Sequence, residues 1–186
     1  MKNKIWIVIA VLLTAVIVAA AILYPKLSDK YSAETTIPES KSSAVVQTDD
    51  FTIYDSDMNK VKLSDYFGKP IVVNFWASWC GPCKSELPAF SDAYEKYKDD
   101  VVFLMVNLPD GYSDSQKSIE KFVSENGYAF PVYYDFDNDA STVYGVNSIP
   151  ETLFINADGT LYDTQIGAMN ATALESYIQH IKGESE

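Results

Sequence analysis

Two short runs of consecutive apolar residues, 71–76 and 101–106, stand out in the middle of the chain. Apolar side chains at nearly every position are typical of strands that are buried on both faces of a sheet. Between the runs Leu87, Phe90 and Tyr94 recur at helical spacing. A strand, a helix and a strand in this order predict a parallel βαβ unit.

The pattern on either side of this unit predicts shorter elements. Residues 51–67 indicate two short strands that form a hairpin, followed by one helical turn over 65–67 with Ser64 as its N-cap. We expect an α/β fold with a mixed, mostly parallel central sheet, an antiparallel hairpin at its end, and helices on both faces. The remaining predicted elements are a helix over 115–125, a strand over 130–134, a helical turn over 140–144, strands over 151–156 and 161–166 joined at Asp158-Gly159, and a helix over 171–181.

The N-terminal part of the chain has a different pattern. Residues 5–23 carry no charge, and as a helix they would span about 28 Å, close to the hydrocarbon thickness of a bilayer. We therefore expect residues 1–27 to be a membrane anchor that leaves the rest of the chain outside the cytoplasm. A signal peptide cleaved after a small residue is the alternative, and cleavage would make the protein secreted. Residues 28–48 are rich in Ser, Thr and charge and predict a flexible linker to a domain over 49–186.

Composition and charge narrow the range of partners. The hydrophobic content of 47% is sufficient for the core of one domain, and the net charge is −12 with lysine as the basic residue throughout. Because so acidic a chain repels phosphate backbones, nucleic-acid binding is not expected.

Both cysteines of the chain lie in the stretch WCGPC, as Cys80 and Cys83. A structural zinc site would need further ligands, and His180 is the one histidine of the chain. A structural disulfide that closes so short a loop would contribute little stability. At the junction of a strand and a helix, however, the free N–H groups and the helix dipole stabilise a thiolate, which is the species that attacks disulfides. This setting favours a redox pair over the other two interpretations.

The stretches NFWASWCGPCKSELP, LSDYFGKPIVVNFW and IPETLFINADGTL together resemble the thioredoxin superfamily. Within it they are similar to the membrane-tethered TlpA/ResA-type thiol-disulfide oxidoreductases, over residues 45–182. The resemblance implies a thioredoxin-like fold in which Cys80 attacks, Cys83 resolves, and Pro150 follows a cis peptide bond beside them. The expected substrate-binding residues are Trp79, Gly81, Pro82, Ile149 and Pro150.

One position departs from cytoplasmic thioredoxins, which carry a buried aspartate where this chain has Asn74. An asparagine cannot accept a proton, and the TlpA/ResA resemblance implies that an acid on the helix, here Glu86, replaces it. Helical i, i+3 spacing places Glu86 beneath Cys83, where a partly buried carboxyl would have a raised pKa. A solvated glutamate on the helix surface is the alternative. Glu151 is expected to be either a substrate contact or an exposed strand residue.

The resemblance implies an enzyme, a monomeric extracytoplasmic reductase of protein disulfides whose redox-active Cys80–Cys83 pair needs no other cofactor. The implied partners are oxidised exported proteins, such as apocytochromes c or a methionine sulfoxide reductase, and a CcdA-type membrane electron donor. A disulfide-forming oxidant and a non-enzymatic binding domain remain alternatives. A peroxiredoxin is disfavoured, because no proline lies in the stretch 73–79 before Cys80.

Overall fold

The computed structural model describes residues 47–183; the predicted anchor over 1–27 and most of the predicted linker over 28–48 lie outside them. Within the described part the strands form one seven-stranded sheet in the order β2-β1-β5-β4-β3-β6-β7. The strands are β1 (Thr52–Tyr54), β2 (Lys60–Lys62), β3 (Ile71–Trp76), β4 (Val102–Asn107), β5 (Val132–Tyr134), β6 (Glu151–Ile155) and β7 (Leu161–Ile166). The helices are the 3-10 helix η1 (Leu63–Tyr66) and the α-helices α2 (Gly81–Tyr97), α3 (Gln116–Asn126), α4 (Asp139–Val143) and α5 (Ala171–Lys182). None of these helices is long and apolar enough to cross a membrane.

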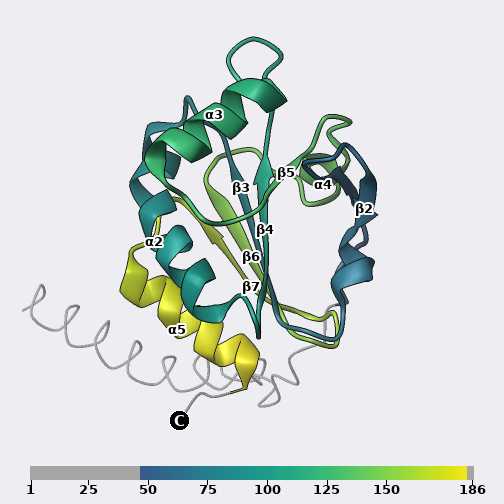
Figure 1. The fold of residues 1–186 in the computed structure, drawn as a ribbon. Helices are drawn as coiled ribbons and strands as arrows, with labels where there is room; N and C mark the ends of the chain where they lie inside the picture. Colours follow the sequence, from purple (N-terminus) through teal and green to yellow (C-terminus); the bar gives the residue numbers. More distant parts are fainter. Residues whose placement is uncertain (1–46, 184–186) are drawn as a thin grey trace, which may run out of the picture. The chain divides into compact units, whose positions relative to one another are not determined.

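The predicted βαβ unit is confirmed at the centre of the sheet. All six side chains of β3 are buried, and β3 pairs in parallel with β4 from Ile71–Val102 to Trp76–Asn107. The helix between them, α2, packs against one face of the sheet together with α3 and α5 (Figure 1). This face buries a large part of the core, including Val72, Trp76, Leu87, Phe90, Ile119, Phe154 and Ile178.

The opposite face of the sheet is covered by η1 and α4, which lie on the other side of the sheet from α2 in Figure 1. Leu63 of η1 and Ala140 of α4 are buried against Val73 and Phe75 of β3. Neighbouring residues of β3 therefore contribute to two different cores, as expected for a strand covered on both faces. The C-terminal end of β3, where the cysteines follow, is fixed from both sides.

The sheet is mixed, but the expectation that it is mostly parallel is wrong. Parallel pairing is confined to β3–β4 and β4–β5, whereas β6 is antiparallel to β3 and β7, and β1 to β2 and β5. The reason lies in α4, which has five residues and rises only about 7.5 Å. So short a helix does not return the chain along the sheet, and β6 therefore runs opposite to β3, starting beside the C-terminal end of that strand.

Two details at the start of the domain differ from the expected pattern. The single helical turn is η1, with Lys62 rather than Ser64 at its N-cap, because the Asp65 carboxylate accepts the Lys62 N–H at 2.8 Å. Ser64 instead hydrogen-bonds to Asp50. Thr48, at the end of the predicted linker, donates both its N–H and its hydroxyl to the Gly159 carbonyl. The paired structure thus includes residues just before position 49.

The contact at Gly159 generates a stability prediction. Gly159 has a φ of +82°, and a Cβ atom there would lie 2.6 Å from Gln47 Nε2 and 2.9 Å from Phe67 Cε2. We expect Gly159→Ala to lower the free energy of unfolding by about 1–3 kcal/mol, measured by urea denaturation. Gly145→Ala is the matched control, since φ is +62° but the space around it is open. Equal losses in the two variants would contradict the close packing at Gly159.

Candidate active site

Cys80 lies at the N-cap of α2, directly after the turn that follows β3. The turn is closed by the Cys80 N–H, which donates to the Ala77 carbonyl at 3.2 Å. The Cys80 Sγ accepts the backbone N–H of Cys83 at 3.1 Å. Pro82 in the first helical turn has no N–H to leave unsatisfied. The sequence therefore aims a free helix N–H at the first sulfur of the motif.

The two cysteines form a disulfide, with an S–S distance of 2.02 Å. Cys80 keeps 5% of its surface exposed, whereas Cys83 is fully buried. Of the two sulfur-bearing residues, only Cys80 therefore offers accessible surface to another molecule. Attack by Cys80 and resolution by Cys83 stay a prediction, and this difference in exposure is the observation that supports it.

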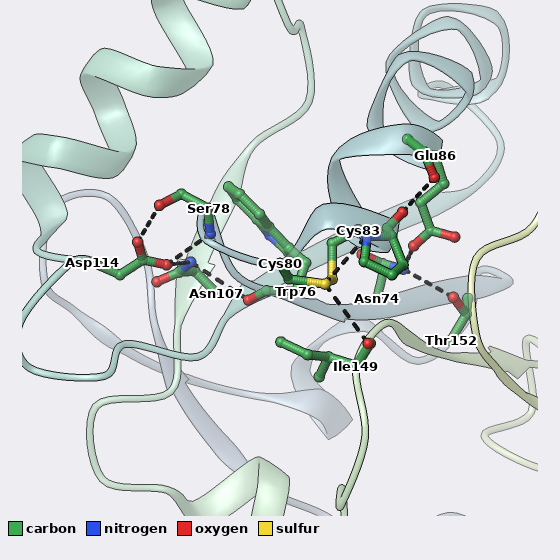
Figure 2. The surroundings of a disulfide bond; sticks show 12 residues. Asn74, Trp76, Ser78, Cys80, Cys83, Glu86, Asn107, Asp114, Ile149 and Thr152 are labelled. Carbon is green, nitrogen blue, oxygen red and sulfur yellow. Dashed lines mark hydrogen bonds between the residues drawn. A yellow bond between two sulfur atoms is a disulfide. The ribbon is translucent and has the colours of Figure 1, made fainter.

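The loop before β6 lies against the disulfide. Ile149-Pro150 is a cis peptide bond, and the Ile149 carbonyl oxygen lies 3.7 Å from Cys80 Sγ (Figure 2). The Pro150 carbonyl accepts the Gly167 N–H at 2.8 Å, which ties the loop to the end of β7. The structure thus brings Ile149 to the cysteines and places Pro150 beside them. The other predicted substrate contacts lie at the turn itself, and all three are exposed: Trp79, Gly81 and Pro82.

Glu86 is not a solvated surface residue, because only 1% of its surface is exposed. Its Oε1 accepts the side-chain N–H of Asn74 at 2.9 Å, and its Oε2 accepts the backbone N–H of Met169 at 2.9 Å. Burial raises the pKa of Glu86, while these two hydrogen bonds act in the opposite direction. A carboxyl in this position can hold or release a proton in the interior, close in sequence to the buried Cys83.

Asn74 connects Glu86 to the sheet, as Figure 2 shows. Its Nδ2 donates one hydrogen bond to Glu86 and one to the Thr152 hydroxyl, each at 2.9 Å. Thr152 lies directly opposite Asn74 in the pairing of β3 with β6. Its Oδ1 is buried without a hydrogen-bond partner. A neutral amide can donate to a carboxylate here, whereas an aspartate at position 74 would place two acidic groups in contact.

Glu151 is not the exposed strand residue that was one of the two expectations for it. It is buried rather than exposed on the strand, and burial raises its pKa. Because side chains alternate along a strand, Glu151 faces the opposite side of the sheet from Thr152 and therefore from Glu86. The two buried glutamates are separate sites.

A second buried carboxylate at the turn was missed by sequence reasoning. Asp114, in the loop before α3, accepts hydrogen bonds from the Ser78 N–H at 2.9 Å, the Ser78 hydroxyl, and Asn107 Nδ2 at 2.8 Å (Figure 2). Ser78 and Asp114 are 36 positions apart, and no local pattern connects them. The sequence marked the position of Asp114 only indirectly, because Asp114 directly precedes Ser115, the N-cap of α3. Nothing in the sequence indicated its contact with Ser78.

Within residues 47–183 no group of three or more Cys, His, Asp or Glu side chains is arranged to hold a metal ion. The chemistry that the site offers is that of its sulfur atoms. A disulfide at the start of a helix, after a central strand and against a cis-proline loop, defines a thiol-disulfide exchange centre in a thioredoxin-like fold.

Comparison with known proteins agrees with this class. The family model described as the AhpC/TSA family matches residues 46–164, and the chain belongs to this family. A thiol-disulfide oxidoreductase ResA from Oceanobacillus iheyensis is 34% identical over 67% of this chain and 64% of its own length. A ResA protein from Geobacillus kaustophilus is 30% identical over 89% of this chain and 91% of its own.

Solved structures show the same similarity. A putative thiol:disulfide interchange protein DsbE from Chlorobium tepidum has a TM-score of 0.65 and 30% identity, over 74% of this chain and 96% of its own. The pneumococcal exposed lipoprotein thioredoxin Etrx1 from Streptococcus pneumoniae has a TM-score of 0.61 and 31% identity, over 71% of this chain and 99% of its own. The chain is thus an enzyme of the thiol-disulfide oxidoreductase class.

The buried Glu86 generates a prediction for the pH dependence of stability. Because the folded-state pKa is raised above the unfolded value, the folded protein retains a proton that the unfolded chain releases. Glu86 therefore makes the free energy of unfolding fall as the pH rises from about 4.3, the ordinary glutamate value, through the raised pKa. We expect Glu86→Gln to remove this contribution, measured as the difference between wild-type and variant stability across that range.

Glu125→Gln is the matched control, because the Glu125 side chain is 65% exposed. Its difference curve is the reference for the loss of one exposed carboxylate. A Glu86→Gln difference curve that does not differ from this reference would contradict the burial of a titrating carboxyl at position 86.

Proposed function

We propose that this protein is a membrane-anchored, extracytoplasmic reductase of disulfides in exported proteins. The observation that carries the proposal is the Cys80–Cys83 disulfide at the N-terminus of α2, with the Cys83 N–H directed at Cys80 Sγ. A helix N-terminus stabilises the thiolate form of Cys80 and so favours its attack on another disulfide.

The reaction begins from the reduced dithiol. The Cys80 thiolate attacks one sulfur of the substrate disulfide and displaces the other as a thiolate, which gives a mixed disulfide. Cys83 loses its proton and attacks Cys80 Sγ, which displaces the substrate's second sulfur. The substrate leaves with two additional electrons and takes up two protons, and the enzyme is left with the Cys80–Cys83 disulfide.

Glu86 is proposed to accept the proton that Cys83 loses. The support is its burial, its raised pKa and its place one helical turn after Cys83 on α2. The Asn74 amide donates to Glu86 and stabilises its charged form, which makes the acid available as a base. Asn74 thus orients the acid, although it does not itself take the proton.

The direction of electron flow is proposed from the Gly81-Pro82 dipeptide, which resembles that of reducing thioredoxins. A CcdA-type membrane protein would then reduce the Cys80–Cys83 disulfide after each turnover. Apocytochromes c or another exported redox protein, such as a methionine sulfoxide reductase, would be the substrate. Location outside the cytoplasm is supported by the uncharged stretch 5–23 and by the similar pneumococcal protein, which is described as exposed.

The proposed direction predicts a reducing potential. We expect the full-length chain to reduce insulin, with a Cys80–Cys83 potential nearer to that of thioredoxin, about −270 mV, than to that of the oxidant DsbA, about −120 mV. Equilibration with glutathione buffers followed by thiol alkylation measures the potential. A potential near that of DsbA, together with no reduction of insulin, would contradict the proposed reductase and favour the disulfide-forming oxidant.

The division of roles between the cysteines predicts different trapping behaviour. In cells, Cys83→Ala should accumulate mixed disulfides through Cys80, because the resolving thiol is missing. Cys80→Ala should accumulate none, since the remaining Cys83 is fully buried. Non-reducing electrophoresis separates these cases. If neither variant trapped a protein, and Cys80→Ser left the cellular role intact, the non-enzymatic binding domain would be the correct interpretation.

A further inference from the structure

Two exposed aromatic side chains lie on the segments that Asp114 joins beside the disulfide. Trp79, directly before Cys80, is 52% exposed, and Tyr112, in the loop between β4 and α3, is 98% exposed. That loop projects from the end of β4 next to α3 (Figure 1). A tyrosine with almost its whole surface in water contributes nothing to the core, so packing does not explain the residue.

The loop that carries Tyr112 is closed by hydrogen bonds to a single carboxylate, that of Asp110. Asp110 Oδ1 accepts the backbone N–H groups of Tyr112, Ser113 and Asp114, at 2.9, 2.7 and 3.1 Å. These bonds lower the pKa of Asp110 to about 2, so its side chain is charged at neutral pH. We refer to residues 110–114 as the 110–114 loop. One carboxylate thus closes the loop and gives it a negative charge.

Asp114 attaches the 110–114 loop to the catalytic turn. Only 2% of its surface is exposed, and it accepts both the N–H and the hydroxyl of Ser78, the residue before Trp79 (Figure 2). Asn107 at the end of β4 provides the third hydrogen bond. The segment that carries Tyr112 and the segment that carries Trp79 therefore meet at the buried Asp114 carboxylate. Its partner Ser78 lies two residues before Cys80.

We propose that the 110–114 loop and Trp79 form a docking surface for the positively charged, extended polypeptide segment that flanks the substrate's disulfide. Tyr112 and Trp79 contact the segment, and Asp114 is a positioning residue that holds the two rings beside Cys80. This inference rests on the proposed function, because the segment is bound where its disulfide reaches Cys80.

The charge of the occupant follows from the residues that would meet it. Asp110 is ionised within the loop, and the whole chain carries −12, so an acidic segment would be repelled. Lysine and arginine side chains bind over the faces of exposed Tyr and Trp rings. An extended cationic segment therefore gains from both the rings and the charge, whereas a neutral segment gains from the rings alone.

Binding to the oxidised, full-length protein tests this surface without any turnover. The probes are a cysteine-free lysine-rich peptide and a glutamate-rich peptide of the same length, titrated by calorimetry. We expect the lysine peptide to bind more tightly, and Tyr112→Ala to raise its Kd by about two- to five-fold. Tyr112→Phe should retain most of the affinity because it keeps the ring. Tyr162→Ala, an exposed aromatic on β7, is the control and should leave the Kd unchanged.

Asp114→Asn tests the positioning role through a double-mutant cycle. Asp114→Asn alone should also weaken lysine-peptide binding, and adding Tyr112→Ala should weaken it little further, since both changes remove the same contact. Strictly additive losses would remove Asp114 from the proposal. Equal binding of the two peptides, or no effect of Tyr112→Ala, would overturn the docking surface itself.

Turnover separates this inference from the proposed function. Reduction of a small neutral disulfide by wild type and Tyr112→Ala should proceed at the same rate, because that substrate does not reach the loop. If the wild type did not reduce the small disulfide, the proposed reductase function would be contradicted. The peptide-binding result would still decide whether the docking surface exists.

Discussion

The N-terminus of α2 is capped by a sulfur atom, and the arrangement of the site depends on this interaction. Cys80 Sγ accepts the Cys83 N–H, so the same hydrogen bond begins the helix and stabilises negative charge on the first sulfur. The buried strand β3 delivers Cys80 to this position. The antiparallel start of β6 places Ile149 and Pro150 against it. The sheet thus assembles one reactive sulfur, one helix end and one cis-proline loop.

Two buried carboxylates fix the surroundings of that sulfur from different sides. Glu86 joins α2 to β3 through Asn74 and to the segment before α5 through Met169. Asp114 joins the turn at Ser78 to the loop before α3. Glu86 is buried in the interior and is proposed to take the proton of Cys83, whereas Asp114 is buried at the turn and is proposed to support the surface beside Cys80. The proposed proton transfer and the proposed docking of the substrate therefore depend on separate acids.

The parts that depend on local sequence were predictable. The apolar run of β3, the helical spacing in α2 and the WCGPC stretch located the catalytic turn, and the Ile149-Pro150 position followed from family resemblance. The direction of most strand pairs was not predictable, because it depends on the short α4. Neither were the partners of the buried acids: Met169 is 83 positions from Glu86, and Asp114 is 36 from Ser78. Such contacts are set by tertiary packing, which no local pattern encodes.

The central claim is that the end of α2 makes Cys80 the reactive thiol. The pKa of the Cys80 thiol tests it most directly, measured in full-length Cys83→Ala protein by the ultraviolet absorbance of the thiolate during a pH titration. The account predicts a pKa clearly below that of a free cysteine, because the Cys83-position N–H and the helix dipole stabilise the thiolate. A pKa equal to or above that of a free cysteine would contradict it.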